Sequence, residues 1–405
     1  MSQTIIMPTV NPEILIWARE TAGLSLDEAA HAIQLKDAHG KSGADRLAAI
    51  EAGEAPLSRP VLLRMAEKYR RSLLVFYLDR PPRRDETGQD FRTVPGEKAP
   101  YDAQLEALIR DIKVRQSLVK SLLEDEETPP HAFVGSMQMR DGTAKMAEDI
   151  ISVLDFSLTT FRARRDYTKA FQYLRQCVED KGIFVMLLGD LGHSSTQIGV
   201  ETFRGFVIAD VIAPFIVVNT QDSASAKSFT LLHEVTHVWL GTTGISGGSD
   251  EVAIERFCNE VAGTILIPAQ ELSALQNINA STFEQAVTQI SEFASQRNVS
   301  RAMVSYKLFK AGQMNEVRWR ELNQRFEQER AASKQAEKDK KAEDGGGGPN
   351  YYVLRRQRLG SALLGLLDRS LNSGAISPTK AAKILGVKPR SVAPLLSYPE
   401  SRGES

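Results

Sequence analysis

Apolar residues recur at three- and four-residue spacing through most of the chain, which is the pattern of amphipathic helices. Between residues 11 and 79 this spacing predicts about four helices separated by short polar turns. The spacing returns from Tyr101 to about Asp180, after a stretch at 80–100 that is rich in Pro, Arg and acidic residues and predicts a linker. We therefore expect a helical module at 1–80, and a linker with a helical lead-in at 81–181.

The pattern changes at Gly182, where short β-branched and aromatic runs are bounded by Gly, Asp and Pro. Such runs predict strands, here at 182–188, 203–208 and 214–219. Two long helices are expected next, over about 222–240 and 250–267, and then two further helices to about Glu329. The expected fold class is α+β and mostly helical, with a small sheet in a domain spanning 182–329.

The C-terminal part divides into a polar stretch and a helical module. A Lys-, Glu- and Asp-rich run ending in four glycines fills 330–350 and predicts a flexible linker, because it has little apolar surface to bury. Helical spacing resumes over 351–405, where Ser377 is expected to cap a helix with Pro378 at its first position and Gly386 at its end. This module is either helix-turn-helix-like or a helical hairpin docked on the preceding domain.

Composition narrows the classes of function. A formal net charge of −1 over 405 residues gives no general attraction to nucleic acid or membranes, so DNA binding requires a local patch. Cys177 and Cys258 form no CxxC pair, which argues against a disulfide scaffold or a thiolate zinc site and fits a reducing cytoplasm. No apolar run approaches the roughly 20 residues that span a bilayer. We expect a cytoplasmic protein without membrane association.

The stretch 233–237 reads His-Glu-Val-Thr-His and is the strongest chemical signal in the chain. Its two imidazoles are four residues apart, on one face of a predicted helix, so His233 and His237 can bind a single zinc ion. Glu234 projects about 100° around the helix. From there it can act as general base, taking the proton from a metal-activated water that attacks a peptide bond.

A catalytic zinc site needs a third protein ligand, and the acidic helix that follows offers three candidates. Glu255 ranks first, because Asn259 one turn later lies on the same face and can orient a histidine from the outer shell. Glu251 and Glu260 are the competing ligands, and neither has a polar partner one turn further on. The chain is expected to bind one Zn²⁺.

Two segments carry a resemblance to a known family. Residues 229–241, with the His-Glu-Val-Thr-His motif, and residues 255–268, ending in Leu-Ile-Pro, closely resemble the ImmA/IrrE family of metallopeptidases. The resemblance implies a gluzincin-like zinc endopeptidase with Glu255 as third ligand and Asn259 as its outer-shell support, acting on specific regulatory proteins. Cys258 stands where the family has Ala, and Val261 where it has Phe; both are expected to affect packing only.

Three further features each have a functional and a structural interpretation. The strand from Phe215 to Asn219 is either an edge that aligns an extended substrate or an ordinary core strand. Tyr306 or His193 is a candidate for polarising the scissile carbonyl, but either residue is also compatible with a purely structural place in the fold.

The N-terminal module resembles an Xre-type helix-turn-helix domain through residues 22–30 and 47–54. Ala30 and Glu51 are 21 positions apart, wider than the family's usual spacing, so an insertion is expected around Lys36 to Gly43. Residues 1–80 have a net charge of zero, whereas phosphate binding needs a basic face. This module therefore contacts either DNA or a protein, and the more basic residues 351–396 are the other candidate for DNA binding.

These observations support one leading hypothesis and one rival. The leading hypothesis is a regulatory zinc endopeptidase that cleaves a specific protein, such as a transcriptional repressor or an antitoxin-like regulator. The rival is a non-enzymatic DNA-binding regulator or antitoxin in which the zinc-peptidase fold is only a scaffold.

Overall fold

The structure is a computed structural model that describes residues 10–20, 22–38, 40–69, 76, 103–164, 166–192, 194–242, 249–275, 278–343 and 350–398. The chain forms two compact units, of which the first includes the N-terminal helices and the second the sheet with its surrounding helices. Helices dominate and the strands form one small sheet, which confirms the expected α+β, mostly helical class. No helix among these residues is long and apolar enough to cross a bilayer. The linker expected at 80–100 lies outside the described residues.

The N-terminal region contains the four helices that its periodicity predicts. They are α1 (Pro12–Glu20), α2 (Leu26–Ala32), α3 (Gly43–Glu51) and α4 (Arg59–Lys68). Their apolar faces enclose a core that includes the fully buried Ile14, Leu47 and Met65. Arg19 of α1 also pairs with the buried Glu51 of α3 at 2.8 Å, which joins the first and third helices.

The connection between α2 and α3 differs from that of a compact helix-turn-helix. It spans residues 33–42 and contains an isolated bridge between Ala38 and Lys41. The turn of a helix-turn-helix unit has about three to four residues, so the connection at 33–42 is longer than such a turn. Its additional length overlaps the insertion expected around Lys36 to Gly43. The Xre-type assignment stays a prediction.

The sheet has the three predicted strands, β1 (Phe184–Leu187), β2 (Gly205–Ile208) and β3 (Phe215–Val218). Their order is β1-β3-β2, with β1 parallel and β2 antiparallel to β3, and Gly205 is paired with Val218. Of the two interpretations of Phe215 to Asn219, the substrate-binding edge is wrong, because both hydrogen-bonding sides of β3 are already paired. All four residues of β3 are buried, as in a core strand.

The helices around the sheet follow the predicted order with one addition. The lead-in consists of α5 (Ala103–Asp125), α6 (Thr143–Leu154), α7 (Leu158–Ala163) and α8 (Tyr167–Glu179), and the two long helices after the sheet are α9 (Ala224–Leu240) and α10 (Ser249–Leu266). Three helices then follow instead of the expected two, namely α11 (Phe283–Gln296), α12 (Arg301–Lys310) and α13 (Glu316–Glu343). One apolar core connects α6, α8, the inner faces of the strands, and α9 to α13.

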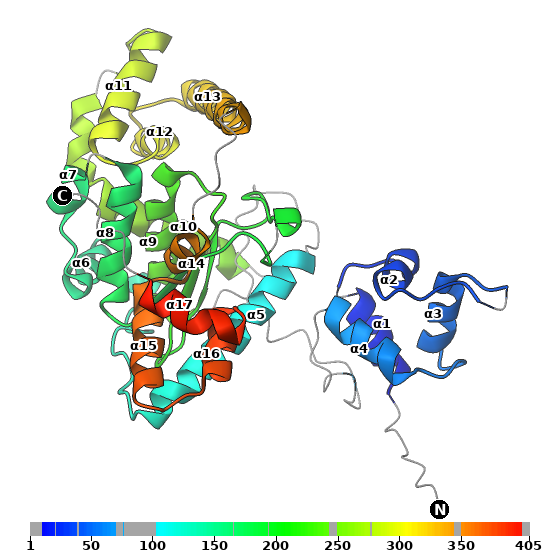
Figure 1. Cartoon of the computed structure of the whole chain (residues 1–405). Coiled ribbons are helices and arrows are strands. Elements are labelled where there is room, and N and C mark those ends of the chain that lie inside the picture. Colours follow the sequence, from blue (N-terminus) through cyan, green and yellow to red (C-terminus); the bar gives the residue numbers. More distant parts are fainter. Residues whose placement is uncertain are drawn as a thin grey trace, which may run out of the picture. The chain divides into compact units, whose positions relative to one another are not determined.

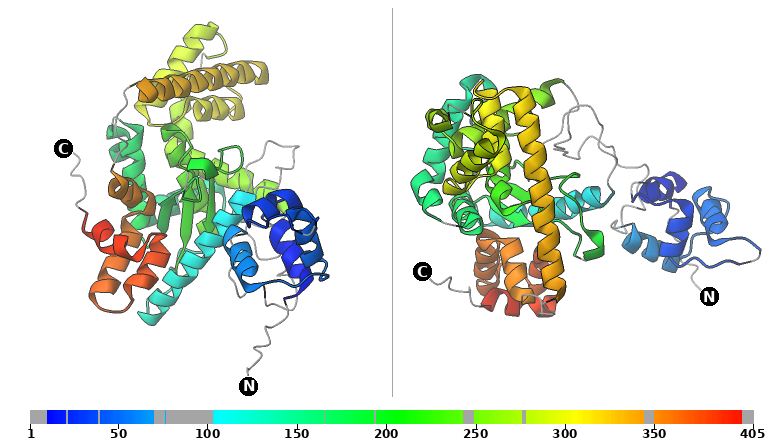
Figure 2. Two further views of the ribbon diagram at one scale, coloured as in Figure 1. Left: turned by 45° about the vertical axis from the view of Figure 1, so that its right-hand side comes forward. Right: turned by 90° about the horizontal axis from the view of Figure 1, so that it is seen from above.

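Helix α13 corrects the prediction of a flexible linker at 330–350. The helix continues to Glu343, and Figure 2 shows it as one long helix. Its Ala, Lys, Glu, Gln and Arg residues have high helix propensity, and i,i+4 pairs such as Arg325 with Glu329 support it. Low apolar content thus did not prevent helix formation. Residues 344–349 lie outside the described part of the chain.

The C-terminal module consists of α14 (Tyr351–Leu359), α15 (Ser361–Asn372), α16 (Pro378–Leu385) and α17 (Val392–Ser397), with a 3₁₀ turn, η6 (Pro389–Ser391), before α17. The predicted caps of α16 are confirmed. The side chain of Ser377 accepts a hydrogen bond from the backbone N–H of Lys380, Pro378 follows at the first position, and Gly386 ends the helix in the left-handed conformation.

This module is docked on the domain that contains the sheet, which agrees with one of the two interpretations of the sequence. Helices α14 and α15 pack against β1, one edge of the sheet (Figure 1). Buried Arg175 of α8 is hydrogen-bonded to Glu179, to the backbone oxygen of Val185 in β1 and to that of Gln357 in α14. Glu179 also accepts a hydrogen bond from the backbone N–H of Ser361, 2.9 Å away. The module thereby covers a sheet edge that would otherwise offer unpaired backbone groups.

Candidate metal centre

Helix α9 carries the His-Glu-Val-Thr-His motif through the middle of the core. The apolar side chains of Leu231, Leu232 and Val235 are fully buried. The indole Nε1 of Trp239 donates a 2.7 Å hydrogen bond to Asp149 on α6. The helix ends at Gly241, which adopts φ +65° and lies against Gly135. A Cβ at this glycine would approach the Cα of Gly135 to 2.9 Å, so the turn after the motif requires glycine.

His233, His237 and Glu255 meet where α9 packs against α10. The Nε2 atoms of the two histidines are 3.1 Å apart. The carboxylate of Glu255 lies 3.2 Å from Nε2 of His233 and 3.1 Å from Nε2 of His237. Ligands of a tetrahedral zinc at its usual N and O distances are roughly 3.3 Å apart. The structure thus brings the three predicted ligands together at the spacing that one zinc ion needs.

Polar partners hold the other ring nitrogen of each histidine. Nδ1 of His233 lies 2.9 Å from Oδ1 of Asn259, which acts as the predicted outer-shell partner, and Nδ1 of His237 lies 3.1 Å from Oγ1 of Thr242. A hydrogen bond at Nδ1 fixes the tautomer that leaves the Nε2 lone pair available for a metal. Sequence reasoning missed Thr242, whose only signal is its place directly after the helix-ending Gly241.

Glu255 is held in its charged form at this site. Burial pushes the pKa of its carboxyl upward, but the hydrogen bonds and charges of His233 and His237 outweigh burial and hold this pKa well below its usual range. A carboxylate that stays ionised beside two imidazoles is suited to bind a divalent cation.

Cys258 is a second candidate for the third ligand, because it lies on α10 beside the same two histidines. His233, His237 and Cys258 are all buried, and each has one ligand atom that lies within 4.8 Å of the ligand atoms of the other two. Glu255 approaches the Nε2 atoms to 3.1–3.2 Å, which is the closer match to zinc geometry. Glu255 is therefore the better placed of the two candidates for the third ligand. Of the two other carboxylates considered, Glu260 is exposed to solvent, and the side chain of Glu251 lies outside the described residues.

Glu234 lies fully buried between the metal centre and the beginning of β2. A Cβ added to Gly205 would stand 2.6 Å from Oε1 of Glu234 and 3.0 Å from its Cδ and Cγ. Real Cβ atoms essentially never approach so closely. Glycine at 205 therefore lets β2 pass this carboxylate without displacing it, and Gly205 is a residue beside the site that neither motif nor spacing identified.

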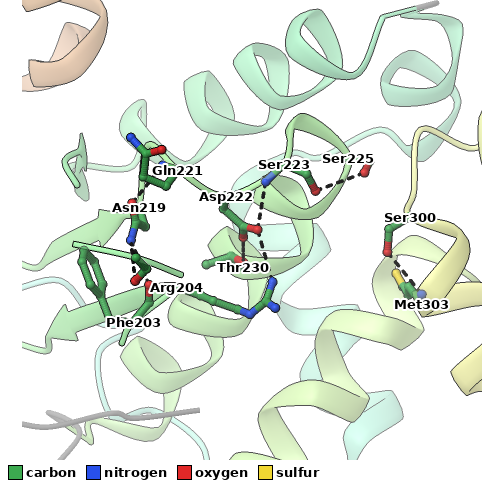
Figure 3. A network of polar contacts seen from close by, with 11 residues as sticks. Phe203, Arg204, Asn219, Gln221, Asp222, Ser223, Ser225, Thr230, Ser300 and Met303 are labelled. Carbon is green, nitrogen blue, oxygen red and sulfur yellow. Dashed lines mark hydrogen bonds and ion pairs between the residues drawn. The ribbon is translucent and has the colours of Figure 1, made fainter. Parts of the chain in front are cut away.

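A network of hydrogen bonds fixes β2 in this position (Figure 3). The side chain of Asn219 donates to the backbone oxygen of Phe203 at 2.9 Å, and its backbone N–H donates to that of Arg204 at 2.8 Å. Asp222 accepts hydrogen bonds from Arg204 at 3.2 Å and from Thr230 on α9 at 3.0 Å. The turn from β3 into α9 thus holds the residues before Gly205 and the helix that carries Glu234.

Tyr306 is an exposed residue of α12. Its ring packs against Trp319, and the neighbouring Lys307 donates to the backbone oxygens of Gly263 and Ile267 near the end of α10. A role of Tyr306 at the scissile carbonyl stays a prediction. His193, the other candidate for polarising the carbonyl, lies outside the described residues.

The donor set fits zinc. It consists of two imidazole nitrogens and one carboxylate, each histidine has an outer partner, and His233 and His237 are almost completely excluded from solvent. Clustering two buried imidazoles and a partly buried carboxylate is costly unless a cation or a proton compensates the charge. These residues would hold the metal, and Glu234 would stand beside it.

A comparison with protein families agrees with this arrangement. Residues 181–309 match the Peptidase_M78 family, described as the IrrE N-terminal-like domain. The matched range contains the whole sheet and helices α9 to α11, and it supports both the resemblance to the ImmA/IrrE family and a metallopeptidase. The search of curated proteins and the search of solved structures give no match.

Proposed function

We propose that this chain is a zinc-dependent endopeptidase with a regulatory task, which cleaves a specific protein partner such as a transcriptional repressor. The main support is the convergence of His233, His237 and Glu255 within 3.1–3.2 Å of one another, with Glu234 buried beside them. The family match over residues 181–309 supports the same reaction class. The alternative of a regulator with a non-catalytic scaffold leaves the placement of Glu234 and Gly205 without a purpose.

The chain's own residues account for the steps of peptide hydrolysis. Zinc, when bound, would lower the pKa of a water molecule to about 7 and polarise the scissile carbonyl. Glu234 accepts the proton of the attacking water on a carboxylate oxygen and delivers it to the leaving amide nitrogen. Asn259 and Thr242 keep the rings of His233 and His237 oriented throughout.

Strand β2 is the element best placed to align a substrate. Among the described strands it has one neighbour, β3, and its first residue lies against Glu234. An extended peptide added along β2 would form main-chain hydrogen bonds and present its scissile bond next to the general base. Side-chain pockets along the peptide would then supply the selectivity that a regulatory peptidase needs.

The test uses the purified full-length protein and the matched variant Glu234→Gln. Each is incubated with zinc and a lysate of the source organism, and new protein N-termini are identified by chemical labelling and mass spectrometry. We expect wild-type protein to create a small set of new N-termini that the variant does not create. Equal sets from both proteins would contradict the proposed role of Glu234.

Metal analysis separates this outcome from misfolding. Glu234→Gln leaves His233, His237 and Glu255 unchanged and keeps the size of the side chain, so the variant is expected to bind zinc as the wild type does. A cleavage-deficient variant that has also lost zinc would point to damage at the site, and Glu234→Asp would then replace it. If wild-type protein binds zinc, creates no new N-termini and still acts as a regulator in cells, the non-enzymatic alternative holds.

A further inference from the structure

The C-terminal module has a charge that differs sharply from that of the rest of the chain. Residues 350–398 contain eight Lys and Arg residues and a single acidic residue, Asp368, which gives a formal charge of +7. The whole chain has a net charge of −1, so the remaining residues together have a formal charge of −8. A local concentration of positive charge of this size predicts a polyanionic partner.

Two of these cations have structural tasks. Arg355 donates to the backbone oxygens of Leu385 and Gly386 at the end of α16, at 2.7 and 2.8 Å. Arg356 donates to those of Leu395 and Leu396 in α17, at 2.9 and 3.0 Å. Both arginines satisfy carbonyl groups that a helix end leaves unpaired. They hold the module together and do not contribute to a free basic surface.

Five other cations remain near the surface along the second half of the module. They are Arg369, Lys380, Lys383, Lys388 and Arg390, of which all but the half-buried Lys380 are exposed. No ion pair is found between any of these five and an acidic side chain of the described residues. Their charge is therefore available to a ligand.

Four of the five gather around one turn of the chain. Lys380 and Lys383 lie on α16, three residues apart and hence on neighbouring positions of one helix face. Gly386 ends α16 in the left-handed conformation, and Lys388 and Arg390 follow directly in the turn and in η6, which packs on α16. We call these four residues the basic turn. A helix, a short turn and a second helix, α17, surround it, as in compact helix-turn-helix units.

The chemistry of the basic turn favours nucleic acid over a protein partner. The exposed large hydrophobic residues of the described module are Tyr351 and Leu354, and both lie on α14, away from the basic turn in sequence. Protein interfaces depend on buried apolar or aromatic anchors, which the basic turn lacks. Phosphate groups require only accessible cations and small polar groups, such as those of Thr379 and Ser391.

The same residues favour a duplex over a single strand. Single strands bind through aromatic platforms on which bases stack. Here the tyrosines contact each other: Tyr352 meets Tyr351 edge to face and stacks on Tyr398, with ring centroids 5.3 and 5.8 Å apart, and none belongs to the basic turn. A basic helix-turn-helix-like surface without stacking rings is suited to the phosphates of double-stranded DNA.

We propose that the basic turn, Lys380, Lys383, Lys388 and Arg390, is a surface that binds the phosphates of duplex DNA. Because α14 and α15 pack on β1, and Arg175 and Glu179 connect the module to α8, DNA bound there would be held on the same compact unit as the metal centre. A protein substrate bound to the same DNA would then meet the peptidase at raised local concentration.

The experiment measures binding of the full-length protein to a fluorescent mixed-sequence DNA duplex by anisotropy over a series of salt concentrations. With three to four phosphate contacts, affinity should fall roughly 10²-fold between about 50 and 200 mM salt. The variant Lys383→Glu, Lys388→Glu, Arg390→Glu should lose nearly all of this binding and its salt dependence. All three residues are exposed, so the fold should be preserved, and circular dichroism and zinc content check this.

The matched control places the same charge change on exposed cations of the N-terminal module, Lys36→Glu, Lys41→Glu, Arg59→Glu. It should bind the duplex as the wild type does. The proposal is overturned if this control loses binding while the C-terminal variant retains it, or if polyglutamate of equal charge competes with DNA as well as unlabelled duplex does. Equal or tighter binding of single-stranded DNA would overturn the duplex assignment. None of these results depends on peptidase activity.

Discussion

Replacing Gly205 with alanine tests whether β2 sets the position of the general base. The added Cβ would lie 2.6 Å from Oε1 of Glu234, whereas ordinary contact begins at 3.4 Å, so the carboxylate must retreat by about 0.8 Å. A displacement near 1 Å at a reacting group costs on the order of 10²-fold in rate. We therefore expect kcat/KM to fall roughly 10- to 100-fold, or about 1.4–2.7 kcal/mol of transition-state stabilisation.

The assay is cleavage of a substrate identified by N-terminal labelling, followed as the rate of product formation at limiting substrate. Gly199→Ala is the matched control, because its added Cβ would meet the carboxylate of the exposed Glu201, which can swing into solvent. The control should retain activity, and both variants should bind zinc normally. Unchanged activity in Gly205→Ala would refute the placement of Glu234 as general base, whereas loss of zinc would show that the strand supports the ligands instead.

Three further predictions concern the ligands and one half-buried lysine. Zinc affinity, measured by competition titration, should fall by roughly 10- to 100-fold in Asn259→Ala, because Asn259 lies in the outer shell. It should fall further in Glu255→Gln and stay unchanged in Cys258→Ala. Loss of the metal in Cys258→Ala would instead favour a thiolate ligand. Burial lowers the pKa of Lys307 to about 8, below its unfolded value of about 10.4, so the unfolded chain binds more protons between these values. The unfolding free energy should therefore rise with pH across that window by ~1–3 kcal/mol. Urea denaturation should show this rise in the wild type and not in Lys307→Met, and a rise that persists in the variant would assign it to another group.

The local elements could be predicted from sequence because each depends on a short pattern. The three strands follow from β-branched and aromatic runs, and the caps of α16 follow from Ser377, Pro378 and Gly386. The spacing of His233 and His237, together with Glu255 on the next helix, was sufficient to select the residues that the structure brings together. Their binding of zinc stays a prediction.

What sequence could not supply depends on tertiary pairing. The central place of β3 results from the crossover order β1-β3-β2, which no pattern within a strand reveals. Thr242 and Gly205 reach the site through a tight turn and a strand register. The sequence predicts too short a helix for α13, because the low apolar content of residues 330–343 indicates a segment without a core. Charged residues of high helix propensity nevertheless form a helix there.

The most direct test of the central claim measures zinc stoichiometry and substrate cleavage on the same preparations of wild-type protein and Glu234→Gln. The account predicts about one zinc per chain in both proteins, and a rate lower by ~10²-fold or more in the variant, as expected when a general base is removed. Removal of zinc with a chelator should abolish wild-type cleavage, and added zinc should restore it. Equal cleavage rates in the two zinc-loaded proteins, or full cleavage by the metal-free wild type, would contradict the account.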